Sequence, residues 1–161
     1  MNEFTIVKAE RKDVKSIYNC IVGLAEYEKL LDQIDMNEAQ LEHAIFDLHE
    51  AMVVLGKEED NVVGFALYFY NFSTFKAKKG LYLEDLFIFP KYRQKGYGKK
   101  LFLYLIEQAV QEGCRRMEWS CLDWNQPAID FYHSLGATRL EDWSIFRIDE
   151  KTLQLYKQNS R

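Results

Sequence analysis

One segment constrains the fold of this chain more than any other, because it joins a strand, a basic glycine-containing turn and an amphipathic helix. Residues 81–89 have the composition of a β-strand, which Pro90 ends. The turn Arg93-Gln94-Lys95-Gly96-Tyr97-Gly98 follows, and apolar residues then recur with helical spacing over 98–112. A helix that begins directly after such a turn gathers free backbone N–H groups and partial positive charge. We therefore predict an anion site here that suits a pyrophosphate.

Two better-known phosphate-binding sequences are excluded at this turn. It lacks the Gly-Lys-Ser/Thr of a Walker loop and the Gly-x-Gly-x-x-Gly of the dinucleotide fingerprint. Arg93 and Lys99 add formal positive charge. Taken alone, however, a basic turn before a helix is most often only a turn, so the interpretation depends on the rest of the chain.

The remaining sequence predicts a mixed α/β or α+β domain. Asn37 can cap a helix, and the polar turn 57–61 between two β-branched and aromatic runs predicts a hairpin. No linker-like change of composition divides the 161 residues, so we expect a single domain, 1–161. The other expected elements, in chain order, are a strand at 4–8, a helix from Asp13 to about Glu28, hairpin strands at 51–55 and 62–72, a strand at 117–122, a helix beginning near Pro127, strands at 137–140 and 144–148, and a polar C-terminal helix or tail.

Composition excludes several classes of function. Lys and Arg number 21 against 25 Asp and Glu, and a net charge of −4 is a poor basis for binding nucleic acid. The three cysteines have no metal-ligand spacing, and their odd number is typical of reduced thiols in the cytoplasm. No stretch reaches the length of a membrane span. We expect a cytoplasmic protein with no metal, nucleic-acid or membrane partner.

A second motif makes the first one specific. Asn125-Gln126-Pro127-Ala128-Ile129-Asp130-Phe131-Tyr132, with Leu135-Gly136-Ala137 after it, follows a strand and begins a helix. Together with Arg-x-x-Gly-x-Gly after the Leu-Glu-Asp-Leu-Phe-Ile-Phe-Pro strand, it resembles the signature blocks of the GCN5-related N-acetyltransferase superfamily. The resemblance implies that superfamily's fold, a mixed twisted sheet with helices on both faces. It also implies acetyl-CoA as cosubstrate, entering where the fourth and fifth strands splay apart.

Other segments are similar to the spermidine/spermine N-acetyltransferase group, which includes a branch that prefers thialysine. The polyamine enzymes typically carry Tyr-Asp-Pro-Trp in the loop after the long strand, where this chain reads Phe72-Ser73-Thr74-Phe75. The Ser-Thr-aromatic version is closer to the thialysine branch, so we expect thialysine or a lysine-like amine to serve at least as well as spermidine. The similar segments are Leu24–Glu28, Gly64–Tyr68, Tyr82–Asp85 and Asp123–Asn125.

The resemblance implies direct transfer to the amine without an acyl-enzyme. An alkylammonium with a pKa of about 10.4 must lose a proton before it attacks. Glu84 is the candidate base, acting through water, although without the motif it would be interpreted as a solvated carboxylate. Tyr132 is the candidate general acid for the CoA thiolate; by spacing alone it would be a core aromatic beside Phe131.

The resemblance also assigns binding roles. It places Leu86 and Ile88 beside the cofactor, where a bulged strand would offer backbone groups to pantetheine and an N–H to the oxyanion. Asn125 can contact pantetheine, cap its helix, or do both. The candidate cofactor-binding residues are Leu86, Phe87, Ile88, Arg93, Gln94, Lys95, Gly96, Tyr97, Gly98, Lys99, Asn125 and Tyr132, and the candidate acceptor-binding residues are Tyr27, Glu28, Glu84 and Asp85.

Three functional hypotheses follow. The first is an enzyme that moves acetyl from acetyl-CoA to a primary amine of a small molecule: a lysine-like amine, a diamine or a polyamine. The second is an acetyltransferase for protein or peptide amines, and the third is a non-catalytic acyl-CoA-binding sensor on the same fold. The presence of Glu84 and Tyr132 favours an enzyme. The resemblance further implies a homodimer.

Overall fold

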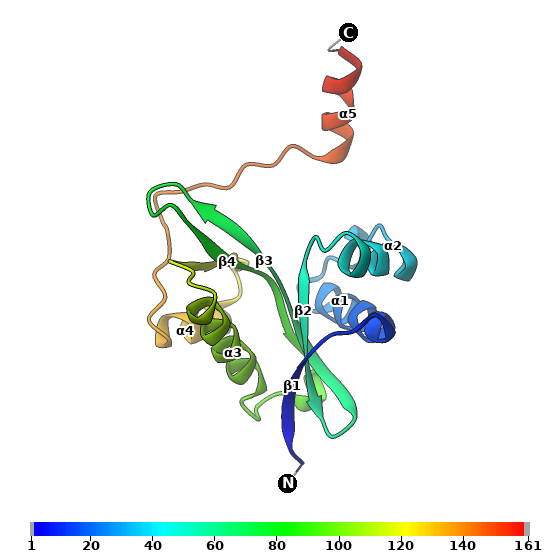
Figure 1. Ribbon diagram of the computed structural model, residues 1–161, viewed down its shortest axis with the longest axis vertical. Helices are drawn as coiled ribbons and strands as arrows, with labels where there is room; N and C mark the ends of the chain where they lie inside the picture. The colour runs from blue at the N-terminus through cyan, green and yellow to red at the C-terminus, as the bar shows by residue number, and fades with distance from the viewer. Residues whose placement is uncertain (1, 160–161) are drawn as a thin grey trace. The chain divides into compact units, whose positions relative to one another are not determined.

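Five strands form one sheet in the order in which they occur along the chain (Figure 1). The computed structural model describes residues 2–159. Neighbouring strands from β1 to β4 pair antiparallel, and only β5 pairs parallel, with β4. The strands are β1 (Phe4–Lys8), β2 (Met52–Glu58), β3 (Asn61–Ser73), β4 (Lys78–Ile88) and β5 (Met117–Trp119).

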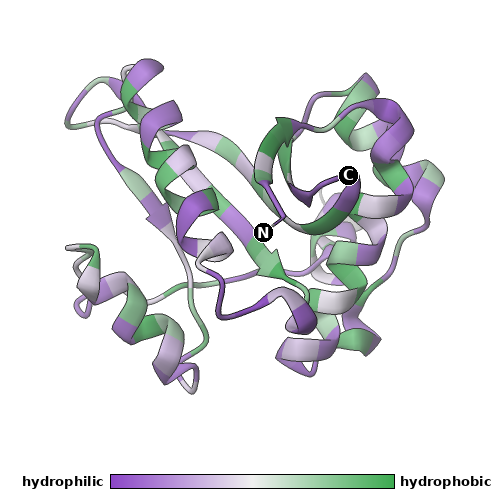
Figure 2. Ribbon diagram, turned by 90° about the horizontal axis from the view of Figure 1, so that it is seen from below, coloured by the Kyte–Doolittle hydropathy of each residue, from purple (hydrophilic) through white to green (hydrophobic). Residues whose placement is uncertain are grey.

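Helices cover both faces of this sheet, as the resemblance predicts. Helix α1 (Val14–Glu28) and helix α2 (Glu38–Glu42), which continues into the π-helical turn η3 (His43–Asp47), lie on one face, and α3 (Tyr97–Gln111) lies on the other (Figure 1). Figure 2 shows the helices banded in hydrophobic green and hydrophilic purple, the pattern of amphipathic helices with one buried side. Three 3₁₀ turns complete this part: η1 (Arg11–Asp13), η2 (Leu31–Gln33) and η4 (Pro90–Tyr92).

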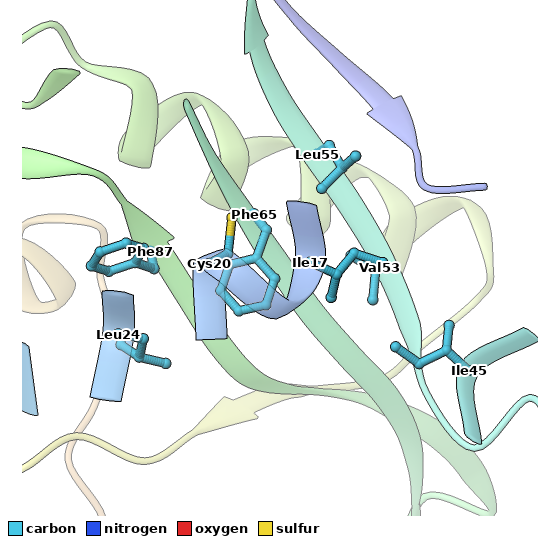
Figure 3. Close-up of a cluster of buried hydrophobic side chains, with 8 residues drawn as sticks. All are labelled: Ile17, Cys20, Leu24, Ile45, Val53, Leu55, Phe65 and Phe87. Carbon is cyan, nitrogen blue, oxygen red and sulfur yellow. The ribbon is translucent and has the colours of Figure 1, made fainter. Parts of the chain in front are cut away.

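Alternation along β2 divides its side chains between the two faces. Val53 and Leu55 join the core beneath α1, where eight buried residues meet (Figure 3). Gly23 brings α1 close to β4, because a β-carbon there would lie 2.7 Å from the ring of Phe87. Helix α1 is thereby fixed against the strand that carries the Leu-Glu-Asp motif. The cluster comprises Ile17, Cys20, Leu24, Ile45, Val53, Leu55, Phe65 and Phe87.

Most of the elements expected up to Ser120 are confirmed. Strand β1 has the predicted bounds, and Asn37 caps α2 by accepting a hydrogen bond from the backbone N–H of Gln40. The hairpin is present with longer strands, and its turn is Glu59–Asp60. The strand predicted at 117–122 ends at Trp119.

The chain forms two compact units, one up to Ser120 and one from Cys121 onwards. The second unit contains α4 (Gln126–Ser134) and α5 (Glu150–Asn159), which confirms the helix near Pro127 and the polar C-terminal helix. The strands predicted at 137–140 and 144–148 are wrong, because these residues form irregular backbone. The apolar side chains of Ile145 and Phe146 are 81% and 93% exposed. Within residues 2–159, no helix combines the length and the apolar composition that crossing a membrane requires.

Candidate active site

The Leu-Glu-Asp motif lies at a bulge in β4. Leu67 of β3 pairs with Asp85, but the next residue, Tyr68, pairs with Leu83, so Glu84 has no partner in the ladder. The predicted bulge is therefore present, at Glu84 rather than among residues 86–88. An extra residue at this point locally changes the directions of the side chains along the strand.

Asp85 shares the α1 face of the sheet with Phe87, which is two residues further along β4. Burial, together with the negative charges of Glu84 and Glu28, raises the pKa of its carboxyl to about 7. Burial also raises the pKa of Glu28, the last residue of α1. Three candidate residues, from a helix end and a bulge, therefore form one acidic cluster.

Beyond the pairing of Leu83 with Trp119, β4 and β5 separate. Strand β5 ends at Trp119, while β4 continues through Ile88. Residues 85–88 thus have ladder partners on β3 and none on β5, which is the divergence that the resemblance predicts. The side chains of Phe87 and Ile88 are buried, so these residues present mainly backbone at that edge.

The predicted anion turn leads directly into α3. Gly96 is the residue before the helix and has a left-handed backbone (φ 79°), and Gln94 is also left-handed (φ 64°). A β-carbon at Gly96 would meet no atom within 4 Å, so open space adjoins the first turn. A β-carbon at Gly98 would lie 3.8 Å from both Leu86 and Ile88, which places the start of α3 beside the diverging part of β4.

Arg93 connects this turn to the acidic side of the site. Its Nε donates a hydrogen bond of 2.8 Å to the carbonyl of Ile88. Its guanidinium carbon lies 4.7 Å from the centre of the Tyr27 ring and 5.3 Å from that of Phe87. The structure thus brings Tyr27, Arg93 and the end of β4 together.

Three other candidate residues lie in or directly after the turn, and the surroundings of their side chains differ from those of Arg93. The side chains of Lys95 and Tyr97 both contact the carboxylate of Glu58 on β2, so their contribution to an anion site is expected from their backbone. Lys99 is exposed in the first turn of α3.

Asn125 and Tyr132 belong to the second unit. The Asn125 side chain accepts a hydrogen bond of 3.4 Å from the N–H of Ala128, which confirms its predicted role as the cap of α4. Tyr132 lies two residues before the end of α4, and its ring centre is 5.6 Å from that of Phe131. His133 is exposed, as expected.

In the loop at residues 72–75, whose sequence differs from that of the polyamine enzymes, one side chain is buried and the others are exposed. Ser73 is buried, and its hydroxyl accepts a hydrogen bond from the backbone N–H of Lys76. Phe75 is fully exposed. Lys79 forms an ion pair of 2.8 Å with Glu112.

The comparisons with known proteins agree with this geometry. Residues 14–137 match the acetyltransferase (GNAT) family across both units. The chain belongs to this family. A thialysine N-epsilon-acetyltransferase from Bos taurus is 35% identical over 161 residues, covering 92% of this chain and 94% of that protein. An L-ornithine N5-acetyltransferase from Arabidopsis thaliana is 44% identical over 93 residues, 58% of this chain and 41% of that protein. The structure of an integron cassette protein from the mobile metagenome of V. cholerae superposes with a TM-score of 0.82 at 26% identity, over 96% of this chain and 98% of the other.

This acetyltransferase is therefore an enzyme that acetylates amines, which favours the enzyme hypotheses over the non-catalytic sensor. Sequence reasoning missed two features of the site. The pKa of Asp85 depends on Glu28, which is 57 positions away in the chain, and Glu58 lies in a hairpin strand with no motif to mark it. The only available signal for Glu58 was its charge at the end of a mostly apolar strand.

Proposed function

We propose that this acetyltransferase moves the acetyl group of acetyl-CoA to the terminal primary amine of a small, lysine-like molecule. The observation that carries the proposal is the acidic cluster of Glu28, Glu84 and Asp85 beside the turn that begins α3. Carboxylates attract an alkylammonium, and a helix start suits a pyrophosphate. The ammonium of the acceptor and the pyrophosphate of acetyl-CoA would thus each lie beside charge of the opposite sign, on neighbouring elements.

Residues 93–99 and the backbone of residues 86–88 are the groups that would hold acetyl-CoA. The open space beside Gly96 leaves room for a pyrophosphate against the N–H groups of the first helical turn, which have no acceptor within the helix. The edge of β4 that β5 does not cover offers backbone groups to an extended pantetheine chain. The bound thioester supplies an activated acetyl carbon.

The acidic cluster supplies the proton acceptor. A free alkylammonium has a pKa of about 10.4, and transfer of its proton to an ordinary glutamate with a pKa of about 4.3 would cost roughly 8 kcal/mol. Transfer to a carboxylate with a pKa of about 7 costs roughly 5 kcal/mol. We therefore add Asp85 to Glu84 as a candidate base, with the other members of the cluster holding the ammonium in place.

The remaining steps are assigned to the second unit. As the amine nitrogen bonds to the acetyl carbon, the carbon–sulfur bond breaks and the thiolate needs a proton. The Tyr132 hydroxyl is the proposed donor, because a phenol can donate at neutral pH and its motif position matches the family. Asn125 fixes the start of the helix that carries Tyr132.

Two observations favour a lysine-like acceptor over a long polyamine. The similar proteins from Bos taurus and Arabidopsis thaliana are named for thialysine and for L-ornithine, both amino acids with a terminal amine. In the loop where the polyamine enzymes carry Asp, Ser73 is buried and hydrogen-bonded to backbone, so it offers no second charge for a polyamine.

Initial rates with acetyl-CoA and a panel of acceptors test the proposal. The panel comprises thialysine, ornithine, lysine, a short diamine, spermidine, spermine and one lysine-containing peptide. We expect kcat/KM for thialysine or ornithine to equal or exceed the value for spermidine. A preference of about tenfold or more for spermine, equivalent to about 1.4 kcal/mol, would restore the polyamine function. Turnover of the peptide alone would make this a protein acetyltransferase.

A further inference from the structure

Glu58 is a buried carboxylate that contacts the turn before α3 but has no part in the proposed reaction. It is the last residue of β2 and only 6% exposed. A buried charge is unfavourable unless donors compensate it, and Glu58 has three. Its Oε1 accepts a hydrogen bond of 2.9 Å from Asn2, and its Oε2 accepts from Lys95 Nζ at 3.1 Å and from the Tyr97 hydroxyl.

Two of these three donors belong to the turn that begins α3. Lys95 lies between Gln94 and Gly96, both of which have left-handed backbone. Tyr97 is buried at the first position of α3, and its ring stacks on Phe4 of β1 with centres 4.1 Å apart and planes 8° from parallel. Glu58 therefore joins both sides of Gly96 to the β1–β2 edge of the sheet.

The turn needs such a connection because its backbone conformation is unfavourable. A left-handed residue other than glycine, such as Gln94, costs about 1 kcal/mol. Gly96 contributes further freedom, since it loses more conformational entropy than any other residue on becoming fixed. Arg93 holds one end of the turn through Ile88 and Tyr27, and the contacts of Lys95 and Tyr97 with Glu58 hold the other.

We propose that Glu58 is a positioning residue for acetyl-CoA, which holds residues 94–97 in the shape that presents their N–H groups to the pyrophosphate. This inference rests on the proposed function, in which that turn binds acetyl-CoA. A carboxylate in direct contact with a pyrophosphate would repel it, so Glu58 acts through Lys95 and Tyr97. A turn that visits the binding shape only part of the time binds with proportionally lower affinity.

The test is the Glu58→Gln variant, which keeps the shape of the side chain and removes its charge. We expect the Kd for acetyl-CoA, measured by calorimetry, to rise about tenfold, equivalent to about 1.4 kcal/mol. At saturating acetyl-CoA, kcat and the KM for the amine should remain at the wild-type values. In the ligand-free protein, hydrogen exchange at the amides of residues 94–99 should be faster than in the wild type.

Glu112→Gln is the matched control. It removes the same charge and breaks the ion pair with Lys79, but at the opposite end of α3. Its Kd for acetyl-CoA and its exchange at residues 94–99 should equal those of the wild type.

Tyr97→Phe is the second variant, since it keeps the stacking on Phe4 and removes only the hydroxyl that donates a hydrogen bond to Glu58. It should shift Kd and exchange in the same direction as Glu58→Gln by a smaller amount, and it carries the test if Glu58→Gln does not fold.

A Kd within about twofold of the wild type in both variants, with unchanged exchange at residues 94–99, would overturn the positioning role and leave Glu58 a purely structural residue. This outcome differs from a failure of the proposed function. If the wild-type protein itself does not bind acetyl-CoA, the proposed function is wrong and the positioning role falls with it. If the wild type binds acetyl-CoA and the variants bind it equally well, the proposed function stands and the positioning role of Glu58 is wrong.

Discussion

The guanidinium carbon of Arg93 lies 4.7 Å from the centre of the Tyr27 ring, so the turn that begins α3 contacts the end of the helix that carries Glu28. The same side chain donates a hydrogen bond to the carbonyl of Ile88 at the end of β4. One residue thus joins the proposed acetyl-CoA turn, the acceptor side and the diverging strand. In the proposed function, the sites for the two substrates share this contact.

Replacement of Arg93 should therefore affect both substrates. In Arg93→Met, loss of the cation–π contacts and the hydrogen bond should reduce the free energy of unfolding by about 1–3 kcal/mol. The KM values for acetyl-CoA and for the amine should both rise. Lys91→Met is the control, because Lys91 is exposed in the same region of the chain and its ammonium group lies over the neighbouring Tyr92 ring. An effect confined to one substrate would contradict the shared contact.

Gly98 offers a test of the acetyl-CoA site that leaves the fold intact. A β-carbon there would be in ordinary van der Waals contact with Leu86 and Ile88, and alanine is the most favourable helix residue. We expect Gly98→Ala to fold with wild-type stability while its Kd for acetyl-CoA rises by about tenfold or more, since the methyl group occupies the approach between α3 and β4. Glu107→Ala, on the exposed side of the same helix, should leave Kd unchanged. Unaltered affinity in folded Gly98→Ala would remove Gly98 from the cofactor site.

Local patterns predicted the elements of the first unit well, because each signal concerns neighbouring residues. The 3.6-residue spacing from Val14 onward predicted α1, and the Asn37 side chain predicted a cap three residues from its donor. The position of the β4 bulge depends on how β3 and β4 align, and no local signal in β4 reveals that register. The bulge was consequently predicted on the correct strand but a few residues too late.

The strands predicted at 137–140 and 144–148 failed for a related reason. Local composition indicates whether a segment can form a strand, but a strand also needs a neighbour to satisfy its backbone. The pKa of Asp85 is a still longer-range property. Burial raises it most, and the charge of Glu28, which lies at the end of α1 and 57 positions earlier in the chain, raises it as well.

Tyr132→Phe tests the proposed acid. The change removes one hydroxyl and little volume, so packing with Phe131 should persist. If Tyr132 protonates the thiolate, kcat should fall by about 10²-fold while the Kd for acetyl-CoA changes little. His133→Gln, at the next and exposed position of α4, should retain wild-type kcat. A near-normal kcat for Tyr132→Phe at saturating substrates would return this residue to a packing role.

Asp85 makes both activity and stability depend on pH near neutrality. Its carboxyl must be ionised to accept a proton, so kcat/KM should rise with pH through an apparent pKa near 7. Asp85→Asn should lower kcat by about 10²-fold and abolish that acid limb. Glu84→Gln keeps Asp85 and removes one of the charges that raise its pKa, so in this variant the acid limb should move to lower pH. An acid limb that persists unchanged in Asp85→Asn would assign the titration to another group.

The stability of the protein should follow the same titration with the opposite sign. The folded-state pKa of Asp85, about 7, lies above the ordinary value of 3.8, so the folded state holds this proton more tightly than the unfolded chain. The resulting stabilisation is fully present below about pH 4 and is lost as pH rises to about 7, because the unfolded chain ionises first. Denaturant unfolding of wild type and Asp85→Asn at pH 5 and pH 8 measures this. Since asparagine does not titrate, the variant should gain stability relative to the wild type between pH 5 and pH 8. A difference between the two proteins that is the same at both pH values would show that Asp85 is ionised throughout, and the cluster would then lack the proton acceptor assigned to it.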